Sequence, residues 1–288
     1  LFSEGGRFHY AGFRFGSFMF GNIAAQIAGY YLIAALLIPL GYGHLKLRRW
    51  VGPLTQALLW AWLVVGAPLS VLAAFILFAS KDLSLPATLM MLVFLGVSYL
   101  VAPGLLIRFY RGQNARQTLA AQDTRSYWIE GLPTPILVLS ALYAFYIIML
   151  HILILFNGMY PVFGVLRYGL QGIVLLDLTI ACLAFITWGT LQQRPWAWWG
   201  SVILLGLFTC STVLTFCRSS YPVLLAGLAF PPRELEILGG VPAQGYHFAL
   251  LVGIPLVITW AVTLLSRRHF SGRAEHPGCA ADGTLRQP

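Results

Sequence analysis

The chain has 288 residues, of which 59% are hydrophobic and only 9% are charged. Soluble domains carry about a quarter charged residues, so this composition excludes an ordinary water-soluble protein. The formal net charge is +9, but the basic residues stand singly or in pairs at the ends of apolar runs. We therefore expect the basic residues to contact the anionic headgroups of membrane lipids, and we expect no nucleic acid as a partner.

Residues 1–19 precede the first apolar run. Between Arg7 and Phe15, aromatic residues alternate with arginine and glycine, and the segment lacks the basic start and apolar core of a cleavable signal peptide. Aromatic rings and arginine side chains favour the headgroup region of a bilayer. We expect an N-terminal arm that lies along the outer surface of the membrane.

Seven apolar stretches follow, each long enough to cross about 30 Å of hydrocarbon as a helix. The sequence thus predicts an all-α integral membrane protein with about seven transmembrane helices. The predicted spans cover residues 20–41, 54–79, 84–107, 136–157, 168–190, 197–217 and 246–265.

A short signature occurs twice. Residues 43–50 (GHLKLRRW) and 189–196 (GTLQQRPW) share the frame G-x-L-x-x-R-x-W, and each copy joins two consecutive spans. Arginine and tryptophan suit a short turn at the membrane surface. The pattern predicts two parallel three-helix units, over 20–107 and 158–270, joined by a connector helix over 136–157. The alternative is that membrane topology alone makes two turns on one side look alike.

The distribution of basic residues predicts the orientation. About twice as many Lys and Arg residues fall on the side of Arg48, Arg49 and Arg194 as on the side of Arg167 and Arg218. The positive-inside rule places the richer side in the cytoplasm. We expect a bacterial cytoplasmic membrane protein with its N-terminus outside and its C-terminus in the cytoplasm.

Three segments lie outside the spans. Residues 108–135 form a cytoplasmic interfacial segment, with one short helix expected from Asn114 to Glu130,. Residues 218–245 form an outer loop, in which two prolines introduce a short helix over 231–238,. The tail over 271–288 is polar and contains glycine and proline, so we expect it to be disordered,.

His151 and Asp177 are the ionisable side chains deepest in the predicted spans. At about 1.5 Å per residue, His151 lies roughly 9 Å and Asp177 roughly 14 Å from the outer ends of their spans. Ionisable side chains in lipid usually face the bundle interior, so we expect the two to be near neighbours. Such a pair would be a structural contact, a cofactor-binding or ligand-binding site, or a proton relay.

No catalytic motif is present. The chain has four cysteines but no C-x-x-C, and it has no H-E-x-x-H, no G-x-S-x-G and no glycine-rich phosphate loop,. We therefore predict no catalytic residue and no metal site. Haem or a chlorophyll-type pigment stays an alternative cofactor that no motif supports, because aromatic belts at the membrane surface explain the many Trp and Tyr residues. Lipid is the expected bound molecule.

Two functions fit these features. The first is a non-catalytic integral subunit of a larger membrane complex, for instance an energy-transducing one, because nearly every span is apolar on all faces. Other integral membrane subunits would then be its partners. The alternative is a small transporter or channel that uses the region of Asp177 and His151. The repeat and the intramembrane carboxylate favour this alternative.

Overall fold

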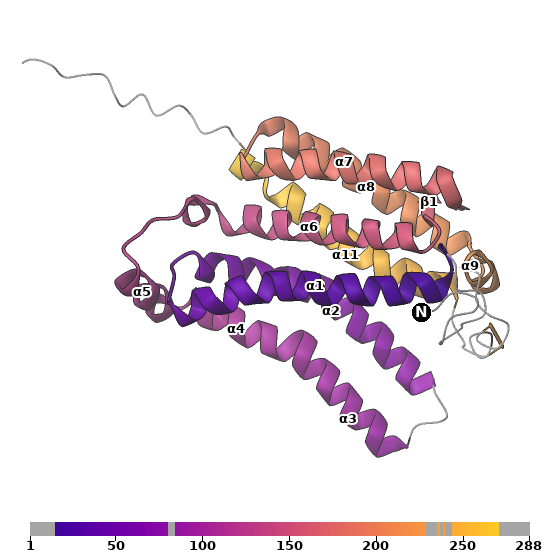
Figure 1. The fold of residues 1–288 in the computed structure, drawn as a ribbon, viewed down its shortest axis with the longest axis horizontal. Coiled ribbons are helices and arrows are strands. Elements are labelled where there is room, and N and C mark those ends of the chain that lie inside the picture. Colours follow the sequence, from indigo (N-terminus) through magenta and orange to yellow (C-terminus); the bar gives the residue numbers. More distant parts are fainter. Residues whose placement is uncertain (1–14, 80–83, 229–234, 237–238, 240–243, 271–288) are drawn as a thin grey trace, which may run out of the picture.

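The computed structural model describes residues 15–79, 84–228, 235–236, 239 and 244–270 (Figure 1). Within these ranges, seven helical segments are long and apolar enough to cross a membrane, which confirms the predicted fold class and, to about one helical turn, the predicted spans. They are α1 (Phe18–Leu45), α2 (Val51–Ala79), α3 (Leu85–Gly96) with its continuation, α6 (Thr134–Leu155), α7 (Gly169–Leu191), α8 (Pro195–Arg218) and α11 (Gly245–Leu265).

The third span is not a uniform α-helix. After α3 the chain forms a short π-helix over Val97–Val101 and then continues as α4 (Ala102–Arg111). Figure 1 shows α3 diverging from the other helices, and large side chains such as Met90 and Phe94 are exposed on it. This span therefore contributes little to the packed core.

Shorter elements lie between the spans: α5 (Gln113–Gln122), η2 (Trp128–Gly131), β1 (Tyr160–Val162), β2 (Val165–Arg167) and α9 (Tyr221–Gly227). A further short helix, η3 (Arg267–Phe270), follows α11. The expectation of one helix from Asn114 to Glu130 is wrong in its second half, because the backbone of Asp123 is extended and α5 ends before it. The predicted arm, the tail and the helix over 231–238 lie largely outside the described residues.

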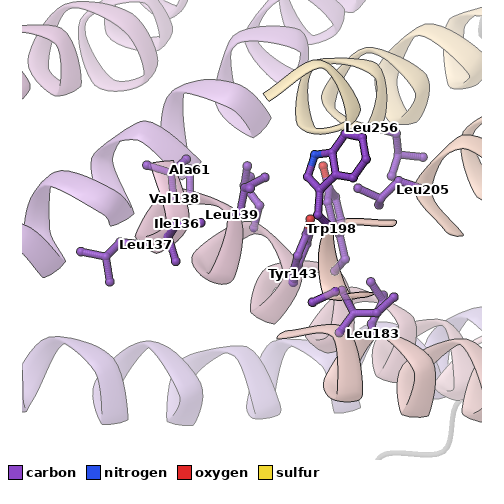
Figure 2. Close-up of a cluster of buried hydrophobic side chains, with 14 of the residues drawn as sticks. Ala61, Ile136, Leu137, Val138, Leu139, Tyr143, Leu183, Trp198, Leu205 and Leu256 are labelled. Carbon is purple, nitrogen blue, oxygen red and sulfur yellow. The ribbon is translucent and has the colours of Figure 1, made fainter. Parts of the chain in front are cut away.

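The core lies where α6, α8 and α11 meet, with α6 also packed against α2 and α7. Figure 2 shows the indole of Trp198 above Tyr143, close to Leu205 and Leu256. Polar contacts join the helices inside this apolar cluster. Tyr143 and Thr263 hydroxyls lie 3.1 Å apart, and the Trp198 Nε1–H donates to the Thr263 carbonyl at 2.8 Å. Each such contact contributes about 0.6–2 kcal/mol in a membrane.

A β-hairpin closes one end of the bundle between α6 and α7. It is held against α8, because the Phe163 N–H donates to Ser211 Oγ at 2.9 Å and the Gly164 N–H donates to Thr215 Oγ1 at 2.8 Å. Ser211 in turn donates to the Pro161 carbonyl. We call this the hairpin end of the bundle, and the opposite end, which carries the α1–α2 and α7–α8 turns, the basic end.

The two copies of the repeated signature fold into the same turn. Leu47 and Gln193 occupy equivalent positions and both have a left-handed backbone, with φ of 49° and 57°. The Arg48 N–H donates to the Gly43 carbonyl at 2.8 Å, and the Arg194 N–H to the Gly189 carbonyl at 3.0 Å. These are the long bonds of a Schellman cap. The shared sequence frame therefore encodes a shared backbone geometry.

Glycine is required in both turns by a close approach. A Cβ atom on Gly43 would lie 2.7 Å from Cζ2 of Trp50, and one on Gly189 would lie 2.5 Å from Cζ2 of Trp196. Each glycine thus lets the helix before the turn touch the indole at the start of the next helix.

Candidate functional site

Asp177 lies on the face of α7 that points away from the bundle. The buried residues of α7 include Gly172, Leu176, Thr179 and Leu183, and a spacing of 3.6 residues per turn puts them on one stripe. Asp177 falls outside that stripe and is exposed. Its carboxylate is therefore presented to whatever surrounds the protein in the membrane.

His151 is also exposed, near the end of α6 at the hairpin end. Its Nδ1–H donates to the carbonyl of Ile147, one turn earlier in the same helix, at 2.7 Å. The ring is thus partly satisfied by its own helix. In the neutral imidazole this leaves Nε2 as an acceptor.

The structure does not join the two predicted site residues. Among the described residues, neither His151 nor Asp177 takes part in an ion pair, so no ion pair joins them. The expectation that the two are near neighbours stays a prediction, because two spans that are apolar all round carry no strong signal of which face is packed. A role of either residue in holding a cofactor or ligand stays a prediction.

In the described residues, the buried polar side chains inside the bundle carry mainly hydroxyl groups, with the indole N–H of Trp198 and the amide of Gln56. In the described part of the chain, Asp123 is the one charged residue among the buried polar ones, and it lies at the basic end outside the spans. No group of three His, Cys, Asp or Glu side chains in this part could hold a metal ion. Within the described ranges, the helices of the bundle therefore bury no charged side chain.

Asp123 is the centre of a contact network that links the α1–α2 turn to the segment after α5. It accepts hydrogen bonds from the Tyr127 hydroxyl at 3.1 Å, the Arg125 N–H at 3.2 Å and the Arg49 N–H at 3.4 Å. The Arg48 guanidinium lies 3.6 Å from its carboxylate. We call this network the Asp123 latch. The segment after α5 is thus tied to the first turn.

A second ion pair strengthens the same link. The Arg49 guanidinium lies 2.8 Å from the Glu130 carboxylate, which also accepts the Tyr127 N–H at 3.0 Å. The second turn differs here, since Arg194 contacts Gln192 instead and pairs with no acidic side chain in the described ranges. The two turns share a backbone but differ in what their arginines bind.

Local contacts determine the charge of Asp123. Burial alone would raise the pKa of its carboxyl group above the ordinary value of 3.8, but the hydrogen bonds named above and the Arg48 charge hold that pKa below it. A carboxylate with a lowered pKa stabilises the folded state above the pKa of the unfolded state, and this contribution is lost as the pH falls through the lower folded pKa.

We expect Asp123→Asn to lower the thermal stability of the purified protein at pH 7 and to reduce its loss of stability on acidification below about pH 4. The measurement is the unfolding temperature against pH in mild detergent. Glu130→Gln is the matched control, because its ion pair is more exposed and contributes less,. Equal pH profiles for Asp123→Asn and the unchanged protein would show that the carboxylate is not bound as described.

His44 forms a polar contact between α1 and α4 near the latch. Its Nδ1–H donates to the Leu40 carbonyl at 2.8 Å, and in the neutral ring Nε2 accepts from the Tyr110 hydroxyl at 2.6 Å. The Thr55 hydroxyl lies 3.4 Å from the same nitrogen. This arrangement joins the first, second and third spans at the basic end.

Sequence reasoning missed the Asp123 latch, although a signal exists. The chain has only nine acidic residues, and two of them, Asp123 and Glu130, follow α5 on the side predicted for Arg48 and Arg49.

Comparison with protein-family models, curated proteins and solved structures finds no match for the chain in any of the three. Its function is therefore argued from the geometry alone.

Proposed function

We propose that this protein is a non-catalytic integral subunit of a larger membrane complex. The observation that carries the proposal is the outward position of Asp177, together with that of His151. A charged side chain near the centre of a lipid-exposed helix costs about 2.5–3.5 kcal/mol on insertion scales. Contact with neighbouring membrane subunits would remove that exposure, and membrane lipids would cover the remaining apolar surface.

The alternative function is a small transporter or channel using Asp177 and His151. Such proteins place their ionisable groups inside the bundle or along a water-filled cavity. Here the two residues face outward, while the buried hydroxyls of Tyr143 and Tyr146 are paired with Thr263 and Thr259. These features favour the subunit over the transporter.

We also propose the orientation and internal organisation of the chain. The excess of Lys and Arg at the basic end supports a cytoplasmic location for that end, in a bacterial cytoplasmic membrane, with the N-terminus outside. The matching geometry of the turns at 43–50 and 189–196 supports two related three-helix units,. Span three, the α3–α4 segment, would then correspond to span seven, α11.

Native isolation tests the subunit function. A tagged chain extracted from its own membrane in mild detergent should migrate on native gels with other integral membrane proteins in fixed stoichiometry. Denaturing detergent should separate them. Migration as a single chain or as a homo-oligomer, combined with solute flux in liposomes that contain only this protein, would replace the subunit function with the transporter.

A further inference from the structure

The outward face of α7 is a continuous apolar surface with one carboxylate in it. Figure 1 places α7 at the edge of the bundle opposite α3. At 3.6 residues per turn, the exposed residues share the face opposite the buried stripe. The large exposed side chains on it are Leu170, Val174, Leu178, Phe185 and Trp188. We call these residues, with Asp177 and Ala181, the α7 outer face.

Asp177 lies at the depth of the hydrocarbon core. By helical rise, it is about 12 Å from the start of α7 at Gly169 and about 21 Å from its end at Leu191,. Arg194 in the following turn and Arg167 before the helix mark the two membrane surfaces. Neither is ion-paired with Asp177, and the cationic headgroup of a lipid stays at the surface. The carboxylate therefore needs a partner that reaches the same depth.

The rest of the face suits a packed helix. Ala181 is exposed one turn after Asp177, and small residues allow the backbones of two membrane helices to approach closely. Towards the basic end, the stacked rings of Phe185 and Trp188, with centroids 5.8 Å apart, provide a rigid apolar contact. The α7 outer face thus combines close approach, apolar area and one charge.

We propose that the α7 outer face binds a transmembrane helix of another subunit, and that this helix presents a lysine or arginine at the depth of Asp177. The inference rests on the proposed function and names the chemistry of one partner. Charge complementarity selects this occupant, because an ion pair satisfies both charges in a medium without water. A second copy of the chain is disfavoured, since two-fold pairing through this face would place one Asp177 near the other.

Crosslinking in native membranes tests the contact. A photoreactive amino acid at Val174 on the α7 outer face, which is 57% exposed, is compared with one at Met90 on α3, which is 70% exposed. The expected result is a crosslink from Val174 to a transmembrane segment that contains lysine or arginine. Met90 should not reach the same segment. A Val174 crosslink between two copies of this chain would overturn the proposal.

Charge variants test the ion pair. We expect Asp177→Asn to reduce recovery of the crosslinked subunit about tenfold and Asp177→Lys to abolish it. Asp177→Lys combined with replacement of the partner's basic residue by aspartate should restore recovery. Because Asp177 is exposed, the unfolding temperature of the isolated chain should not change; if Asp177→Lys does not fold, Asp177→Asn and the crosslinks carry the test.

The outcomes separate the two proposals. Unchanged recovery of the subunit with Asp177→Asn, in a complex that stays intact, would refute the ion pair and leave the subunit function standing. Absence of any stoichiometric membrane partner for the unchanged chain would refute the subunit function itself. A partner segment without lysine or arginine would also refute the charge complementarity proposed for this face.

Discussion

Replacement of Trp198 by alanine is expected to lower the free energy of unfolding by about 2–4 kcal/mol. Its side chain is 7% exposed and lies in the core between α6, α8 and α11. In a bilayer, transfer of an apolar group from lipid to protein contributes little, but the empty volume and the lost packing contacts remain. The variant also leaves the Thr263 carbonyl without the indole donor at 2.8 Å.

The neighbouring Trp199 provides the matched control. It is 56% exposed and touches Trp198 only through an edge-to-face contact with centroids 4.6 Å apart. Trp199→Ala should therefore lower the unfolding free energy by less than about 1 kcal/mol. Reversible unfolding in bicelles measures both variants. A loss from Trp198→Ala no greater than that from Trp199→Ala would mean that the described core does not hold these helices together.

Trp198→Phe separates the two contributions of this residue. The smaller ring still fills much of the site but cannot donate to Thr263. Trp198→Phe should therefore lower the free energy of unfolding, but by less than Trp198→Ala does. A contact of the Arg267 guanidinium with the indole, 5.3 Å from the ring centroid, also weakens in the variant, since a phenyl ring attracts cations less than an indole does.

The sequence predicts the spans well because backbone polar groups in lipid find no water to bond with. An apolar run of about 20 residues must satisfy its hydrogen bonds internally, so its length alone indicates a helix. Hydrophobicity alone does not show which face of such a helix is packed. On α7 the usable signal is the small and hydroxyl residues Gly172, Thr179, Gly189 and Thr190, which share the buried face,. Asp177 lies outside that set, so its outward position was predictable in principle.

Contacts between distant segments could not be predicted from local pattern. The Asp123 latch joins the α1–α2 turn to residues more than 70 positions later, and the β-hairpin depends on two hydroxyls of α8 about 50 positions away. Strands of three residues carry no alternating pattern of their own. Their geometry follows from the packing of the helices, which the sequence signals only weakly.

The glycines of the repeated turn give the second large prediction. A methyl group on Gly189 would lie 2.8 Å from Cβ of Ala197 and 2.5 Å from Cζ2 of Trp196, and Ala197 is fully buried. Gly189→Ala and Gly43→Ala should each lower the unfolding free energy by about 1–3 kcal/mol, the usual effect of overpacking. Thermal unfolding in mild detergent measures the loss.

Gly41 supplies a control two residues before Gly43 in the same helix. No atom lies within 4 Å of a Cβ built on it, so Gly41→Ala should leave stability unchanged or raise it by up to about 1 kcal/mol through helix propensity. Opposite signs for Gly41→Ala and Gly43→Ala would show that close packing, and not backbone freedom, selects glycine in the frame. Similar losses at Gly43 and Gly189 would further show that the two turns depend on the same contact. A neutral effect at either position would mean that the close approach described for that glycine is absent from the folded protein.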